Sequence, residues 1–181
     1  MENQQEIITP YPQKDISPVV PTPQNQSTIP TFTNVSCNMQ IVRLLKAIYA
    51  GRYSAFTSFA YDTYGQILFA ENNPALSATL AKIVLDDIFQ INTLGSAILA
   101  FGGNARFTNG QGSPWGARYL NYSSSPSGFL NSIIRNKQQY LALTQSLTKK
   151  STNQSLTSAL NQIATITQTH IATLQPFLNN L

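Results

Sequence analysis

Polar residues interrupt the apolar stripes of the sequence at four places, and these are the places where chemistry could occur. Between positions 76 and 98, apolar residues recur at steps of three and four, so they share one face of an α-helix. Asp87 and Gln90 fall on that same face, where a carboxylate is costly unless it is paired, neutralised or bound to a metal. The other interruptions are Arg52, Lys137, and Thr167 with His170.

Long helices are needed to position these residues. The apolar spacing predicts four of them, at about 38–69, 74–101, 127–148 and 152–179. The turn at 71–74 ends in Pro74, which suits the first turn of the second helix, and Gly102-Gly103 suits the end of that helix. Pro176 predicts that the last helix ends early or kinks.

The connections between the helices predict the topology. Short connections join the first helix to the second and the third to the fourth, so each pair forms an antiparallel hairpin. The glycine- and aromatic-rich stretch 102–126 could extend to roughly 80 Å and cross the length of a helix pair. Hairpin, long crossover and hairpin predict an all-α, ferritin-like antiparallel four-helix bundle. Because helix midpoints lie at one level in such a bundle, the four polar interruptions should meet.

The N-terminal part of the chain differs in composition from the rest. Residues 1–37 hold six of the ten prolines, which favour extended backbone, and we separate this arm from a bundle at 38–181. Its two apolar pairs, Ile7-Ile8 and Val19-Val20, could dock on a neighbouring subunit. The alternative is a disordered tail, because the arm alone cannot bury enough surface to fold.

Composition narrows the classes of function. Only 10% of residues are charged, and a surface of hydroxyl and amide groups allows copies to pack closely, as in an assembly or coat protein. The alternative is that the low charge only reflects a biased amino-acid composition of the lineage.

The net charge is +4 but the basic residues are scattered, which argues against nucleic-acid binding. We expect no membrane span and see no signal peptide. The single Cys37 leaves a free thiol or an intermolecular bridge.

Several short phrases of the sequence carry a family resemblance. They lie at 50–55 (AGRYSA), 71–74 (ENNP), 83–88 (IVLDDI), 94–95 (LG), 101–107 (FGGNARF) and 114–122 (PWGARYLNY). Together with the helix order, they make residues 38–181 similar to the rubrerythrin-related, ferritin-like proteins of spore-forming Firmicutes. The arm lies outside this resemblance.

The resemblance implies a di-metal centre whose ligands this chain lacks. The family's ligands are a Glu in two helices and a Glu-x-x-His motif in the other two. The corresponding positions here are Arg52, Asp87 with Gln90, Lys137, and Thr167 with His170, allowing one turn of misalignment at Lys137. Only Asp87 and His170 remain as potential ligands, and they cannot balance two divalent cations beside two basic side chains. We therefore expect no metal and no other cofactor.

We hypothesise instead that Arg52 and Lys137 pair with Asp87. The result would be a metal-free polar plug made of Arg52, Asp87, Gln90, Lys137, Thr167 and His170. Removing Asp87 from such a plug should cost about 3–5 kcal/mol. The alternative is that both basic side chains reach out to solvent. His170 is the only histidine and suits a satisfied core residue better than a catalyst, so we expect no enzyme.

These observations predict a non-catalytic, structural or self-assembling subunit whose arm docks on its neighbours. An arm inserted into the next subunit makes a heterologous contact, which can build a homo-oligomer, a filament or a lattice. The family resemblance implies a spore surface or an extracellular filament, although the sequence alone leaves the location unknown. One alternative is a residual metal-binding redox protein that uses Asp87 and His170. Another is a small-ligand or partner-binding module lined by Gln90, Thr144 and Thr167.

Overall fold

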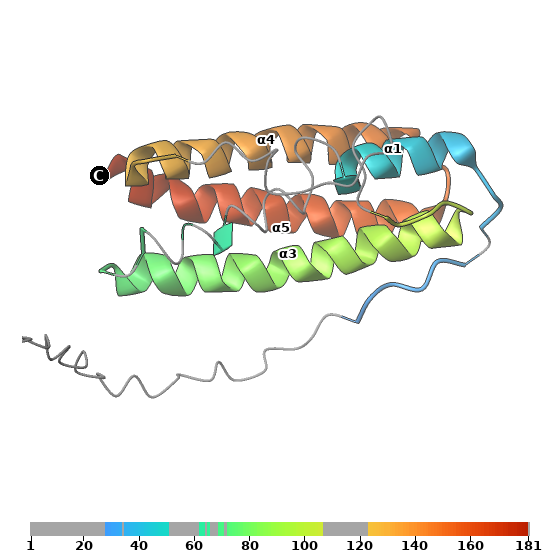
Figure 1. The fold of residues 1–181 in the computed structure, drawn as a ribbon. Helices are drawn as coiled ribbons and strands as arrows, with labels where there is room; N and C mark the ends of the chain where they lie inside the picture. Colours follow the sequence, from blue (N-terminus) through green and yellow to red (C-terminus); the bar gives the residue numbers. More distant parts are fainter. Residues whose placement is uncertain are drawn as a thin grey trace, which may run out of the picture.

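A computed structural model shows that the chain folds into a bundle of long helices. It describes residues 28–33, 35–50, 62, 63, 65, 69, 70, 72–106 and 123–180. The helices in these ranges are α1 (Met39–Ala50), α3 (Pro74–Ala100), α4 (Pro126–Lys150) and α5 (Gln154–Asn179). In Figure 1, α3, α4 and α5 run side by side along the bundle, and α1 lies against one end of α4. The prediction of an all-α fold is confirmed.

Side-chain caps explain where α3, α4 and α5 begin. Asn73 precedes α3 and accepts a hydrogen bond from the Leu76 N–H at 3.0 Å, with Pro74 as the first helical residue. Ser125 accepts from the Gly128 N–H at 3.2 Å before α4, and Asn153 plays the same part before α5. At the end of α3, Gly102 has φ +84°, which is the left-handed conformation that terminates helices. The helices predicted at 74–101, 127–148 and 152–179 therefore match within two residues.

The expected end of the last helix needs correction, and the first expected helix is only partly tested. Pro176 does not end α5, which continues to Asn179. The proline lies so close to the end of the helix that the hydrogen bond it removes belongs to the last turn, where fraying costs little. The helix expected at 38–69 is seen as α1, and Asp62, Thr63 and Gly65 are also helical. Residues 51–61 lie outside the described part of the chain.

The hydrophobic core is divided into two clusters by a polar level. One cluster joins the C-terminal parts of α3 and α4 to the N-terminal part of α5, with Leu94, Leu147 and Leu160 among its buried residues. The other joins the opposite parts of the same helices around Leu80 and Phe129. Each of these helices therefore carries apolar residues on both sides of a polar midpoint. Tyr140 is buried where the stripe had pointed to Leu141, which is only half-buried.

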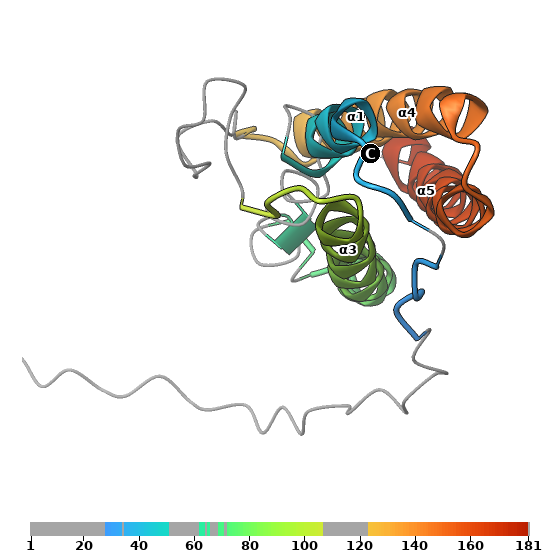
Figure 2. The same cartoon turned by 90° about the vertical axis from the view of Figure 1, so that its right-hand side faces the viewer.

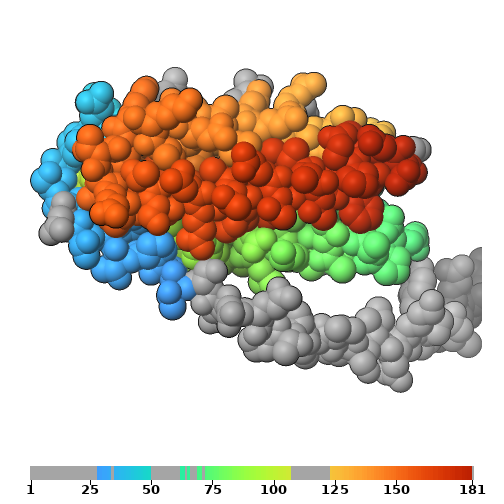
Figure 3. All heavy atoms as spheres, turned by 180° about the vertical axis from the view of Figure 1, so that it is seen from behind, coloured from blue at the N-terminus to red at the C-terminus, as the bar shows by residue number. Residues whose placement is uncertain are grey.

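The four helices contact one another unevenly. Helices α4 and α5 touch along their whole length, as the orange and red atoms in Figure 3 show. Helix α3 packs on α1 and α5 and lies at the edge of the bundle when it is viewed along its axis (Figure 2). By length and composition alone, α3 could cross a membrane, as many core helices of soluble proteins could, and 39% of that apolar window is buried. The expected absence of a membrane span stays a prediction.

Part of the predicted arm packs on the bundle of its own chain. Phe32 and Val35 contact the core cluster that contains Leu94, and the Asn153 side-chain amide donates to the Thr33 carbonyl at 3.3 Å. Asn38 then caps α1, and Cys37 is exposed with a free thiol. The pairs Ile7-Ile8 and Val19-Val20 lie outside the described residues, so their docking is untested.

Candidate functional site

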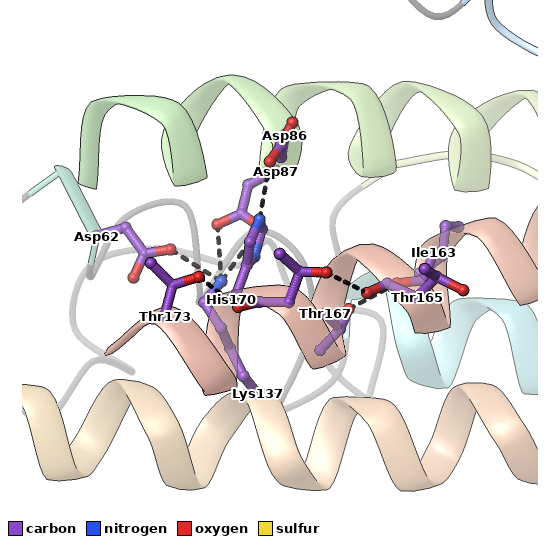
Figure 4. A network of polar contacts seen from close by, with 10 residues as sticks. Asp62, Asp86, Asp87, Lys137, Ile163, Thr165, Thr167, His170 and Thr173 are labelled. Atoms are coloured by element: carbon purple, nitrogen blue, oxygen red, sulfur yellow. Dashed lines mark hydrogen bonds and ion pairs between the residues drawn. The ribbon is translucent and has the colours of Figure 1, made fainter. Parts of the chain in front are cut away.

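The polar level is organised around Lys137 of α4, whose side chain is buried. Its Nζ lies 3.0 Å from Oδ2 of Asp62 and 3.3 Å from each carboxylate oxygen of Asp87. Both aspartates are also buried, and Figure 4 shows them pointing at the ammonium from two different segments of the chain. One cation therefore binds together α4, α3 and the helical residues near Asp62.

The sequence around Lys137 explains why this ammonium faces inward. Ile134 and Tyr140, one turn before and after it, are both buried on the core side of α4. Asp87 has the same position on α3, between buried Ile83 and buried Gln90. Since helical periodicity places these side chains inside, each charge has to find its partner there. The alternative in which Lys137 reaches solvent is wrong.

Burial and charge oppose each other in this cluster. Burial raises the pKa of Asp87 well above its usual value, and the negative charge of Asp62 raises it further, while Lys137 lowers it. Burial lowers the pKa of Lys137, but the two carboxylates outweigh it and raise that pKa overall. The two carboxylates carry one negative charge more than the single ammonium neutralises. Protonation of Asp87 would remove this excess negative charge. The raised pKa of Asp87 favours that protonation.

A second pair, with a buried histidine and a half-buried aspartate, lies beside the first. Nε2 of His170 on α5 is 2.9 Å from Oδ2 of Asp86, whose side chain is 31% exposed. Burial lowers the pKa of His170, the Lys137 ammonium lowers it further, and the hydrogen bond to Asp86 opposes both. His170 is therefore neutral and donates its Nε2–H to Asp86. It does not pair with Asp87, which binds Lys137 instead.

This arrangement predicts a loss of stability in mild acid. Because the pKa of His170 is lowered from 6.5 in the folded protein, the unfolded chain binds more protons just below that pH. The free energy of unfolding should therefore fall as the pH is lowered through about 6.5. Melting temperatures measured from pH 8 to pH 5 test this, with His170→Gln as the control because glutamine can still donate to Asp86. Identical pH profiles for the two proteins would contradict the prediction.

The neutral residues of the predicted plug behave in two ways. Thr167 donates to the Ile163 carbonyl at 2.8 Å and Thr144 to the Tyr140 carbonyl at 2.9 Å, so both hydroxyls are satisfied within their own helices. The Gln90 amide and the Tyr140 hydroxyl are buried without a hydrogen-bond partner among the described residues. Burial and the negative charge of Asp87 raise the pKa of Tyr140 well above its usual value.

Arg52 lies outside the described residues, so its predicted pairing with Asp87 is untested.

Sequence reasoning missed two members of this site, Asp62 and Asp86. A signal for Asp62 existed, because it lies three residues after Phe59 and continues the stripe through Arg52 and Phe56. No such signal marked Asp86, which is half-buried beside the core stripe. Only the position of α5 brings His170 to it.

The donors among the described residues do not form a metal centre. Within the described ranges, no group of three or more His, Cys, Asp or Glu side chains could hold a metal ion. The carboxylates of Asp62 and Asp87 converge on an ammonium, which would repel a metal cation from the same place. Lys137 is itself 1% exposed, so its side chain occupies part of the core at this level. A pocket does open elsewhere, at the end of the bundle where α4 turns into α5 beside Phe101.

Comparison with solved structures supports the fold. The chain is similar to KatB, a manganese catalase from Anabaena, in two crystal structures, each with a TM-score of 0.75 at 16% identity. The similarity covers 87% of this chain and 79% of the catalase chain. No family model matches the chain, and no curated protein matches it. At this identity the likeness shows the fold alone, and the predicted ferritin-like four-helix fold is confirmed. The narrower resemblance to rubrerythrin-related proteins of spore-forming bacteria stays a prediction.

Proposed function

We propose that this protein is a non-catalytic structural subunit, built on a ferritin-like scaffold in which a lysine ammonium stands where relatives of the fold hold metal. The observation that carries this proposal is the buried Lys137 Nζ, which lies within 3.3 Å of carboxylate oxygens of both Asp62 and Asp87. A divalent metal joins helices by binding carboxylates from several of them. The ammonium joins three segments in the same way but has no Lewis acidity to offer and no redox chemistry.

The two groups that could have formed a residual redox centre are engaged elsewhere. Asp87 binds Lys137, and the Nε2 atom of His170 binds Asp86. Metal binding by Asp87 would require its contact with Lys137 to break and would leave that ammonium with one fewer partner, whereas His170 keeps Nδ1 without a partner among the described residues. This cost argues for a structural core and against the residual metal-binding alternative.

The surface and the arm support self-assembly as the function. Only 10% of the residues are charged, so copies of the chain repel one another weakly. Phe32 and Val35 anchor the base of the arm to the bundle, and 27 residues precede the first described residue, Thr28. These residues contain both apolar pairs and are long enough to reach a neighbouring subunit. An arm exchanged in one direction gives a filament or lattice, and a spore surface or extracellular setting follows from the family resemblance.

Deleting residues 1–27 from the full-length protein should abolish assembly and leave the bundle folded. The base of the arm is retained, because it packs on the core. We expect ordered particles or filaments in negative-stain electron micrographs of the full-length protein and a small, uniform species after the deletion. We also expect less than about 0.1 iron or manganese atom per chain by elemental analysis, an order-of-magnitude threshold for adventitious metal.

A matched control keeps the length of the arm. Serine at all four positions of Ile7, Ile8, Val19 and Val20 should have the same effect as the deletion, because the apolar pairs are proposed to make the contact. A metal-loaded species whose size does not depend on the arm would overturn the proposed function.

A further inference from the structure

A pocket opens at the end of the bundle where α1 and α5 begin, and we call it the end pocket. Its volume is about 460 Å³, within the range of about 300–1,000 Å³ in which proteins hold small ligands. Phe101 is buried in its floor beside half-buried Ile41 and Leu44, and asparagine, glutamine, serine and threonine side chains supply most of the remaining lining. Figure 1 shows the start of α1 and the turn between α4 and α5 together at this end.

The charge of the end pocket is positive. Among the lining residues that the structure describes, Lys150 alone is charged, and it is exposed at the end of α4. The neighbouring Lys149 is also exposed but does not line the pocket. The pocket therefore suits a ligand that combines apolar groups with a negative charge, and its side-chain amides suit the hydrogen-bonding groups of an extended peptide.

The arm and the rest of the chain carry opposite net charges. Of the 11 basic and 7 acidic residues in the chain, residues 1–27 hold one basic and three acidic ones, a net charge of −2. Residues 28–181 hold the other ten basic and four acidic ones, a net charge of +6. Opposite charges favour the encounter of the arm with the bundle. Near the free end of the arm, Glu6 directly precedes the apolar pair Ile7-Ile8, which is the combination that suits the end pocket.

We infer that the end pocket receives the segment Glu6-Ile7-Ile8 of a neighbouring copy, with the isoleucines on the apolar floor and the Glu6 carboxylate beside Lys150. The inference rests on the proposed function and names the surface on which the arm docks. Val19-Val20 fits less well, because it lies between two prolines that have no backbone N–H to donate. Segment and pocket are different surfaces of one chain, so the contact is heterologous and can repeat without closing.

The composition of the arm favours the pocket of a neighbouring copy over that of its own chain. Ile8 lies twenty positions before Thr28, the first described residue, and five of the residues between them are prolines. A proline-rich chain extends by about 3.1 Å per residue, which gives a spacer of roughly 60 Å. The longest helix, α3, has 27 residues and is therefore about 40 Å long. The spacer is long enough to carry Ile7-Ile8 beyond its own bundle.

Two segments of the same chain outside the described ranges, 51–61 and 107–122, are the other candidates to cover the end pocket. Each contains a single charged residue, Arg52 in the first and Arg118 in the second. Both are basic, so neither segment offers a carboxylate to Lys150. Glu6 supplies that carboxylate next to two apolar side chains.

A charge exchange in the full-length protein tests the pairing of Glu6 with Lys150. Glu6→Lys and Lys150→Glu should each raise the protein concentration needed for assembly by at least about threefold, because an exposed ion pair contributes little and its reversal adds repulsion. The double variant should return that concentration toward the wild-type value. Lys149→Glu makes the same change in net charge outside the pocket and should have a smaller effect. Equal effects of Lys149→Glu and Lys150→Glu, or a double variant no better than either single one, would overturn the inference.

Disulfide cross-linking between two full-length chains tests the position of the segment. In a Cys37→Ser background, chains with Ile8→Cys are mixed with chains that carry Gln154→Cys in the pocket or Gln162→Cys, a second exposed glutamine of α5 outside it. Tags of different mass distinguish heterodimers from homodimers. Mild oxidation should give several-fold more heterodimer with Gln154→Cys, because a disulfide needs closely spaced Cβ atoms. An internal disulfide as the main product of a chain that carries both Ile8→Cys and Gln154→Cys would show that the arm covers its own pocket, and would overturn the inference.

The result also separates this inference from the proposed function. Assembly that needs residues 1–27 but gives equal heterodimer yields at Gln154→Cys and Gln162→Cys would overturn the end pocket as the docking site and leave the arm contact in place. Assembly that does not need the arm would overturn both.

Discussion

The substitution Lys137→Met is expected to lower the free energy of unfolding by about 3–5 kcal/mol, the usual cost of removing one partner from a buried ion pair. The reason is that Asp62 and Asp87 would remain buried, 0% and 1% exposed, with no cation between them. For a chain of this length, such a loss corresponds to a fall in melting temperature of roughly 6–20 °C. Urea denaturation followed by circular dichroism would measure it.

The pH dependence of this variant should reveal the cause. Carboxylates that are buried without a cation take up protons more readily than they do in the unfolded chain. Above pH of about 4, the folded variant would therefore bind more protons than its unfolded state, and its stability should fall as the pH rises. The defect relative to the wild type should be smaller at pH 5 than at pH 8.

Two matched variants separate the ion pair from packing. Lys82→Met, on the exposed face of α3, should change stability by less than about 0.5 kcal/mol. Asp87→Asn should cost less than Lys137→Met, because Lys137 and Asp62 remain as a balanced pair. From the sequence we expected a cost of about 3–5 kcal/mol for removing Asp87, without comparing it with Lys137. Equal losses for Lys137→Met and Lys82→Met would show that the ammonium does not hold the core together.

The substitution Lys137→Glu is expected to convert the cluster into a site that needs a divalent cation. A third carboxylate would then point at the position between Asp62 and Asp87 where Nζ now lies. Without metal, the repulsion among buried carboxylates should make this variant less stable than Lys137→Met at pH 7. Oxygen ligands of this kind suit Mn²⁺ and Mg²⁺. Added Mn²⁺ should raise its melting temperature in a concentration-dependent manner.

The size of that rescue follows from mass action. A ligand that binds only the folded state stabilises it by about 2.7 kcal/mol at a concentration one hundred times its dissociation constant. Thermal melts with and without Mn²⁺, and isothermal titration calorimetry, would measure it. The melting temperature of the wild type should not change with Mn²⁺. Lys137→Gln should respond weakly, because glutamine has the size of glutamate without its charge. A wild-type response as large as that of Lys137→Glu would contradict the idea that the ammonium excludes the metal.

The local features of the fold could be predicted from the sequence because they depend on near neighbours in the chain. Residues three and four positions apart decide which face of α3 is apolar, and Asn73, Pro74 and Gly102 mark its ends. The same periodicity placed Asp87, Lys137 and His170 on core-facing stripes, and all three are buried. The order of hairpin, crossover and hairpin then led to the four-helix fold that manganese catalase shares.

The tertiary structure alone decided which charge meets which. Asp86 and Asp87 are adjacent in the sequence, yet one binds His170 on α5 and the other Lys137 on α4. Successive residues on a helix point about 100° apart, so the partner depends on which neighbouring helix lies in that direction. The sequence likewise does not show that Leu85, Ile88 and Leu99 are exposed. That follows from the placement of α1 and α5 on the other face of α3, which depends on contacts far apart along the chain.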